Sequence, residues 1–289
     1  MNPERSAISR VDGESRVQKI ERAASRILHI YPRAEAQLKE KAIDITTFTD
    51  LYGAENIQKD TDEVTRLKRE FAKSDGAQVG RLRQEDISHL AQILEYYIYK
   101  GVNEGNWIPQ CTAIKTSEYD DIKNGIDLVL EHSNEHSHTH LGLAVDVTFA
   151  EDVSRKLQRI KQSIDSDELS RVKYFSSEKS HMRGELRNIP RVVSAIDLEI
   201  FEDLFTSEAR GNFKEHQARA ALMQDMETQL ATFSTYAHRT NRRCAERLDQ
   251  THRFVQTIND PIRKRSDPEY LRKHMKAQRR LTEALEIFR

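Results

Sequence analysis

Apolar positions recur at helical spacing through the first hundred residues of the chain. The segment 14–29 places Val, Ile, Leu and Ala side chains on one stripe, and 84–100 does the same with Ile, Leu and Tyr, which is typical of amphipathic helices. Pro32 ends the first of these helices, and Gly101 fits the C-terminal cap of the second. Because no alternation with a period of two precedes residue 110, residues 1–80 are predicted to form a helical region.

The pattern changes to short apolar runs in the middle of the chain. The runs 126–131 and 141–149 are rich in β-branched and other apolar residues, which predicts two neighbouring strands of one hairpin. Nearly every position of 141–149 is apolar, as in a central strand buried on both faces. Further elements are expected at 151–165 (helix), 171–175 and 192–197 (strands) and 197–206 (helix). This order predicts an α/β domain with a mixed central sheet over residues 81–207.

The C-terminal region, residues 208–289, is predicted to be helical. Residues 213–258 contain neither proline nor glycine, and their apolar side chains recur at helical gaps. This pattern predicts one long helix, able to pair with a protein partner or with a second copy of itself in a homodimer. A basic turn between Pro261 and Pro268 and a last helix over 269–288 should follow.

A carboxylate interrupts each of the two apolar runs in the middle of the chain. If the hairpin turn is centred near residues 136–137, Asp127 lies across from Asp146, with Cβ atoms about 4.5–5.5 Å apart. Two carboxylates at that distance repel each other unless a cation or a shared proton lies between them. The pair therefore predicts a divalent metal site. The alternatives are that both acids cap turns, or that each pairs with an arginine or lysine.

The elements around these acids resemble the PD-(D/E)XK nuclease superfamily over about residues 84–200. The acids that carry the resemblance are Asp127, in Asn-Gly-Ile-Asp, and Asp146, in Asp-Val-Thr. The resemblance implies a restriction-endonuclease-like core in which a helix precedes the strands. It also implies that the two acids hold Mg²⁺ (or Mn²⁺), which acts on a phosphodiester.

One position departs from the superfamily pattern. The lysine that the superfamily carries two residues after the second acid is Thr148 here, which has no charge. Some members carry this lysine on the following helix instead. The resemblance therefore implies Lys156, or else Lys161, as the catalytic positive charge.

Other acids near the pair are candidates for additional metal ligands. Glu118, Asp120 and Asp121 precede Asp127 by six to nine residues, and one of them could add a ligand, with Glu118 or Asp120 preferred. Glu95, on the preceding helix, is a further candidate. An alternative interpretation is that Glu118, Asp120 and Asp121 belong to a solvated acidic loop ahead of a strand.

Histidines cluster between the two predicted strands. Imidazole is a common zinc ligand, and alternate residues of a strand share a face. This tract falls at the predicted turn among Ser, Asn and Thr, so we interpret it as a solvated loop rather than a zinc site. The histidines are His132, His136, His138 and His140.

Charge is uneven along a chain whose formal net charge is only −1. Residues 117–152 hold nine acids against one lysine, whereas residues 241–289 hold 13 Lys and Arg against 7 Asp and Glu. The basic end could contact phosphates, although charge runs on helices are also ordinary solvated faces. The candidate nucleic-acid contacts are Arg263, Lys264, Arg265, Arg272 and Lys273.

Composition narrows the class of protein. With 289 residues, 32% of them charged and 37% hydrophobic, the chain favours helices with wide solvated faces. Its two cysteines, Cys111 and Cys244, are too few and too distant for a disulfide framework or a cysteine zinc site. No apolar stretch fits a signal peptide or a membrane span, so we expect a cytoplasmic protein without membrane attachment.

These patterns favour a metal-dependent nuclease that acts on DNA or, less so, RNA. The alternative is a non-catalytic interaction or assembly protein organised by the long helix predicted over 213–258.

Overall fold

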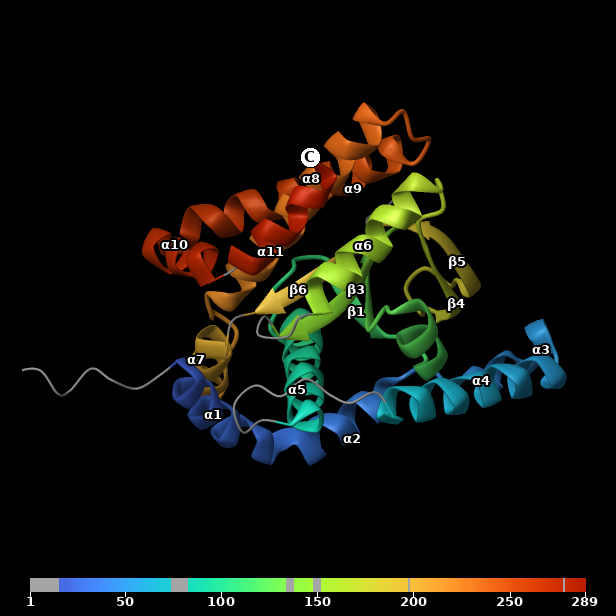
Figure 1. Cartoon of the computed structure of the whole chain (residues 1–289), viewed down its shortest axis with the longest axis horizontal. Helices are drawn as coiled ribbons and strands as arrows, with labels where there is room; N and C mark the ends of the chain where they lie inside the picture. Colours follow the sequence, from blue (N-terminus) through green and yellow to red (C-terminus); the bar gives the residue numbers. More distant parts are fainter. Residues whose placement is uncertain (1–15, 74–82, 134–137, 148–151, 197, 278) are drawn as a thin grey trace, which may run out of the picture.

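The computed structural model shows a mixed α/β protein, as predicted, in which helices surround a small sheet (Figure 1). None of the described helices is long and apolar enough to cross a bilayer. The residues that the structure describes are 16–73, 83–133, 138–147, 152–196, 198–277 and 279–289.

The N-terminal third is helical, which confirms the prediction for the described part of this region. The predicted helices over 14–29 and 84–100 correspond to α1 and α5. The Asp86 side chain accepts a hydrogen bond from the Arg83 amide (2.9 Å), which satisfies a free N–H at the start of α5. The elements are α1 (Arg16–Ile27), a 3₁₀ turn (Leu28–Ile30), α2 (Tyr31–Lys41), a second 3₁₀ turn (Ile45–Phe48), α3 (Thr49–Tyr52), α4 (Ala54–Lys73) and α5 (Gln84–Asn103).

The main sheet has four strands in the order β1-β2-β3-β6. β1 pairs with β2 and β2 with β3 in antiparallel fashion, whereas β3 and β6 are parallel. The prediction that the run 141–149 forms an internal strand is confirmed for the part within β3. The strand β1 was not predicted. The strands are β1 (Cys111–Lys115), β2 (Leu128–Ser133), β3 (His138–Val147) and β6 (Arg191–Ile196).

The predicted register of the β2–β3 hairpin is wrong by two residues. Leu128 pairs with Leu143, so the same register sets Asp127 level with Ala144 rather than with Asp146. Asp146 is paired on the other side of β3, with Ala195 of β6. The last described pair is Ser133 with His138, so the register is centred between residues 135 and 136 rather than 136 and 137. A shift of one residue in the centre moves every pairing by two.

The two faces of the sheet are covered by different elements. Leu128 and Leu130 of β2 belong to the core that α5 helps to form. Val129, between them in sequence, packs with Val172 and Phe175 on the hairpin of β4 (Ser170–Ser176) and β5 (Arg183–Ile189). The predicted strand 171–175 therefore exists, but it pairs with β5 in a separate sheet.

The single long helix predicted over 213–258 is two helices. α8 (Ala218–Arg239) and α9 (Ala245–Arg265) pack against each other, and Asn241 between them has a left-handed φ of 55°. Asn adopts this conformation more readily than most residues, so it allows the reversal without glycine. Pro261 lies inside α9 rather than beyond its end.

The remaining helices complete one continuous core. The Gln229 side chain of α8 accepts a hydrogen bond from the Val193 amide (2.9 Å) and donates to its carbonyl (2.7 Å), so it covers the edge strand β6. One hydrophobic cluster contains residues from all three predicted regions, including Ile27, Leu94 and Phe288. The other helices are α6 (Asp152–Asp165), α7 (Leu198–Ala209), α10 (Pro268–Ala277), α11 (Arg279–Ala284) and a 3₁₀ turn (Leu285–Phe288).

Candidate metal centre

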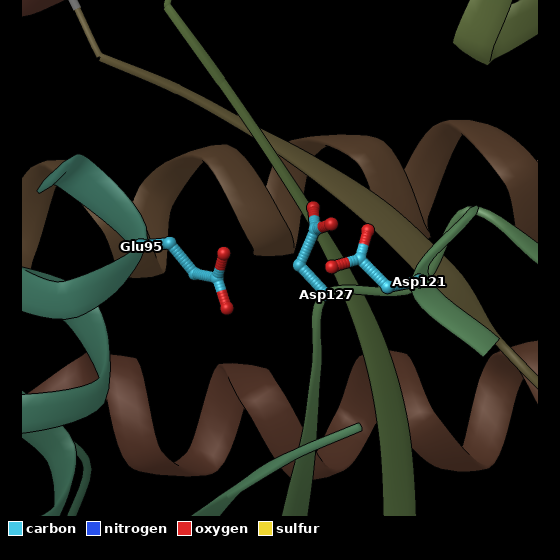
Figure 2. Close-up of side chains that lie close together, drawn as sticks. All are labelled: Glu95, Asp121 and Asp127. Carbon is cyan, nitrogen blue, oxygen red and sulfur yellow. The ribbon is translucent and has the colours of Figure 1, made fainter. Parts of the chain in front are cut away.

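Three carboxylates from different elements converge beside the sheet. Glu95 comes from α5, Asp121 from the π-helical turn η3 (Asp120–Asn124), and Asp127 from the residue before β2. Figure 2 shows the three side chains directed toward one another. Each offers one oxygen, and these three oxygens all lie within 4.8 Å of one another. Glu95 is buried, whereas Asp121 and Asp127 are partly accessible, so the cluster has a buried side and an open side.

The turn η3 is held rigidly against its surroundings. Its first residue, Asp120, is fully buried and accepts hydrogen bonds from the backbone amides of Lys173 (2.7 Å) and Tyr174 (3.0 Å). Gly125 ends the turn with a left-handed φ of 65°, which lets the chain pass directly into β2. Asp121 and Asp127 are therefore fixed at the two ends of one short connection.

A buried lysine supplies positive charge at the cluster. Lys115, the last residue of β1, is 7% exposed, and its Nζ lies 2.8 Å from Glu95 Oε1 and 2.8 Å from Asp121 Oδ2. A second lysine, Lys156 of α6, is half-buried and acts electrostatically on all three carboxylates. The structure thus brings one lysine of α6 and one of β1 to the acids.

The three acids differ in how readily they ionise. Burial raises the pKa of Glu95 to about 7, against the attraction of Lys115. Burial and repulsion from Asp121 and Glu95 raise the pKa of Asp127 well above its usual value. Burial also opposes ionisation of Asp121, but the charge of Lys115 and a hydrogen bond from Asp127 outweigh it and lower that pKa. A proton and Lys115 therefore offset the crowded negative charge.

The donor set fits a hard divalent cation. Carboxylate oxygens are the ligands preferred by Mg²⁺ and Mn²⁺, and Mg²⁺ needs only one or two of them together with water. Glu95 Oε1 is buried and accepts no hydrogen bond of good geometry among the described residues, although Lys115 Nζ is near. A carboxylate oxygen has two lone pairs, so Oε1 can accept a metal in addition to its ion pair with Lys115.

Of the residues predicted for the site, Asp127 and Lys156 reach the cluster, as does Glu95, which was the less favoured extra ligand. Lys161 does not reach it, because it pairs with Asp165 (2.9 Å) and donates to the Tyr236 hydroxyl of α8.

The two preferred extra ligands also lie outside the cluster. Glu118 is exposed and forms an ion pair with Lys68 of α4. Asp120 is the buried anchor of η3 described above. The backbone of Asp146 lies in β3, and Thr148 falls outside the described residues.

The basic residues predicted to contact nucleic acid lie at the end of α9 and in α10. Arg263 pairs with Asp260 (2.7 Å) and Arg272 with Glu269 (3.9 Å), while Lys264 and Arg265 are exposed. The remaining member, Lys273, belongs to α10. This group lies on other elements than the carboxylate cluster.

The interpretation of the histidine tract as a solvated loop is wrong for its two ends. His132 and His140 are buried residues of β2 and β3, and His140 Nε2 lies 3.1 Å from Glu131 Oε1. His138 begins β3, and His136 lies outside the described residues. Among the described side chains, no histidine joins a group able to hold a metal.

Two members of the cluster were not identified as site residues from the sequence. Lys115 lies in a strand whose short pattern was not recognised. Asp121 was named among three neighbouring acids, but Glu118 and Asp120 were preferred to it. The available signal was the spacing: a turn that closes at Gly125 directs only one of the three acids back toward Asp127.

Comparisons with protein-family models, with curated proteins and with solved structures find no match for this chain. The fold and the carboxylate cluster therefore carry the functional argument.

Proposed function

We propose that this protein is a metal-dependent phosphodiester hydrolase that cleaves DNA or, less favoured, RNA. The observation that carries the proposal is the convergence of Glu95, Asp121 and Asp127 within 4.8 Å beside two lysines. Crowding three carboxylates with one buried member costs free energy, and a site that binds a cation is a direct reason to retain it. The resemblance of the sequence around Asp127 and Asp146 to PD-(D/E)XK nucleases supplies the reaction class.

In this proposal Glu95, Asp121 and Asp127 hold Mg²⁺ or Mn²⁺. When bound there, the ion would supply Lewis-acid polarisation of a phosphoryl oxygen and a bound water of lowered pKa as the nucleophile. Asp127 releases the proton that it donates to Asp121 in the free protein, so metal binding releases protons. Asp146 remains a proposed ligand from β3.

The two lysines have different roles in the proposal. Lys115 is buried and contacts Glu95 and Asp121, so it orients the ligands and limits their mutual repulsion. Lys156 is half-buried on α6 and therefore can face substrate as well as the acids. We assign to Lys156 the stabilisation of negative charge that develops on the phosphate.

The experiment is calorimetric titration of Mn²⁺ into the protein, followed by a DNA cleavage assay. Asp127→Asn and Glu95→Gln should each weaken Mn²⁺ binding at least about tenfold, because each removes one charged ligand of the ion. Both should abolish cleavage. Lys156→Met should reduce cleavage by about two orders of magnitude while Mn²⁺ binding remains.

Glu118→Gln is the matched control, since Glu118 is an exposed acid near the cluster that contacts Lys68 instead. It should leave both binding and cleavage unchanged. A wild-type protein that binds neither Mn²⁺ nor Mg²⁺ would refute the proposal, as would an Asp127→Asn variant that still cleaves.

The hypothesis of a non-catalytic assembly protein loses one of its two supports, the long helix; the other, Thr148 at the usual lysine position, is unchanged. The continuous helix predicted over 213–258 is a pair of packed helices, and α8 buries residues on several sides against α9, β6 and α6. We therefore carry forward the hydrolase proposal alone.

A further inference from the structure

An arginine with incomplete hydrogen bonding lies beside the carboxylate cluster. Arg191, the first residue of β6, donates from Nη1 to the carbonyls of Asn124 (2.6 Å) and Gly125 (3.4 Å), which lie three and two residues before Asp127. Its Nε is buried and has no acceptor among the described residues. The Nε–H is therefore removed from solvent without the hydrogen-bond acceptor that usually offsets the cost of desolvation.

A second arginine without a partner stands next to the first. Arg159 lies three residues after Lys156 on α6, so the two share one side of that helix, and α6 packs against β6. Arg159 is exposed and forms no ion pair or hydrogen bond with any residue that the structure describes. Burial and repulsion from Arg159 lower the pKa of Arg191 to about 10, against the attraction of Asp127, in keeping with the packing of α6 against β6.

Two adjacent guanidinium groups whose repulsion is only partly offset favour binding of an anion. Asp127 attracts Arg191, but less strongly than Arg159 repels it, and neither arginine forms an ion pair with a carboxylate in the described part of the protein. The planar donors of arginine match the oxygens of a phosphate group better than a lysine ammonium does. A phosphate that approaches the open side of the cluster would meet these donors beside Asp127.

We propose that Arg159 and Arg191 form a phosphate-binding subsite that holds one backbone phosphate of DNA next to the carboxylate cluster. The inference rests on the proposed hydrolase function and extends it by naming residues that position the polynucleotide. It also places the substrate contact on α6 and β6, rather than on the basic surface at the end of α9 and in α10.

The test measures binding of a short fluorescein-labelled DNA duplex by anisotropy, in EDTA and over a series of salt concentrations. Arg159→Gln should weaken binding roughly tenfold and reduce the slope of log affinity against log salt by about 0.9, the value for one lost phosphate contact. Arg191→Lys keeps the charge and so the slope, but it should lose affinity because the forked donor geometry is gone.

Arg253→Gln is the matched control, since Arg253 is an exposed arginine on α9 and its removal changes the net charge equally. It should bind DNA as the wild type does. Equal losses in Arg159→Gln and Arg253→Gln would overturn the subsite, as would a wild type that binds no DNA in EDTA.

The outcomes separate the subsite from the hydrolase proposal. Arginine-dependent DNA binding without Mn²⁺ binding or cleavage would keep the subsite and refute the hydrolase. Metal-dependent cleavage that is unaffected by Arg159→Gln and by Arg191→Lys would keep the hydrolase and refute the subsite.

Discussion

Lys115 is the residue whose removal most directly tests the electrostatics of the carboxylate cluster. It is 7% exposed, and its Nζ lies 2.8 Å from both Glu95 Oε1 and Asp121 Oδ2. Lys115→Met replaces the ammonium by an apolar side chain of similar length, so it removes the charge with little change in packing. The variant leaves the acids without their nearest cation.

The expected loss follows from the burial of this contact. Removing one partner of a buried ion pair costs about 3–5 kcal/mol, and we expect the lower end because Asp121 keeps 34% of its side chain exposed. The loss should depend on pH, because Glu95, with a pKa of about 7, accepts a proton more readily once Lys115 is gone. We therefore expect the free energy of unfolding to fall by about 3 kcal/mol near pH 8 and by less than half of that near pH 6.

Metal should partly replace the lost charge. A ligand at a hundred times its dissociation constant stabilises the folded state by about 2.7 kcal/mol. Mn²⁺ at such an excess should therefore recover most of the stability of Lys115→Met near pH 8. Mn²⁺ should stabilise Lys115→Met at least as much as it stabilises the wild type, because the added cation also relieves carboxylate repulsion.

The assay is urea unfolding in EDTA and in Mn²⁺, followed by fluorescence of Trp107, the single tryptophan, which is fully buried. Lys123→Met is the control, since Lys123 forms a more exposed ion pair with Glu63 and should lose no more than about 1 kcal/mol. Equal losses for the two variants at both pH values would show that Lys115 is not the counter-charge of the cluster.

Three further predictions concern the same region. In EDTA, Glu95 ionises near pH 7 in the folded protein but near 4.5 when unfolded, so the free energy of unfolding should fall as pH rises between these values. Glu95→Gln should flatten that slope in urea titrations, and an unchanged slope would contradict the assignment. Asp120→Asn should lower the free energy of unfolding by about 2 kcal/mol in urea titrations, because an amide cannot accept all the hydrogen bonds that Asp120 receives. Calorimetry should nevertheless find unchanged Mn²⁺ affinity. The control Glu118→Gln should change neither the stability nor the affinity. Gly125→Ala forces a left-handed residue to carry a Cβ 3.3 Å from Arg191, so scanning calorimetry should show a loss of about 1 kcal/mol, and no change in Tm would refute the strain.

Local sequence pattern was sufficient for most elements near the site. The stripe over 84–100 predicts α5, and 151–165 predicts α6, because an apolar helical face is set by the residues of that helix alone. β1 escaped prediction because its five residues carry too little alternation to distinguish a strand. The break between α8 and α9 escaped because Asn241 can either continue a helix or reverse the chain.

The sequence predicted that β2 and β3 pair, but it did not predict their register. The polar tract around His132 and His140 suggested a turn. In the structure His140 Nε2 lies 3.1 Å from Glu131 Oε1, and this contact offsets the cost of burying the two polar groups. A local pattern does not reveal such a partner across the sheet. The register therefore shifted by two residues, and Asp127 met Asp121 and Glu95 instead of a directly opposed Asp146.

The sequence by itself determined that Asp127 is anomalous, since a carboxylate beside an apolar strand requires compensation wherever the chain folds. It also determined the helices that carry Glu95 and Lys156. Only the tertiary structure decided which charges surround Asp127. Asp121 and Glu95, which repel it, and Lys115, which attracts it, come from a turn, a helix and a strand. Electrostatic interaction depends on distance in space, and that distance is set by packing of the whole sheet against α5 and α6.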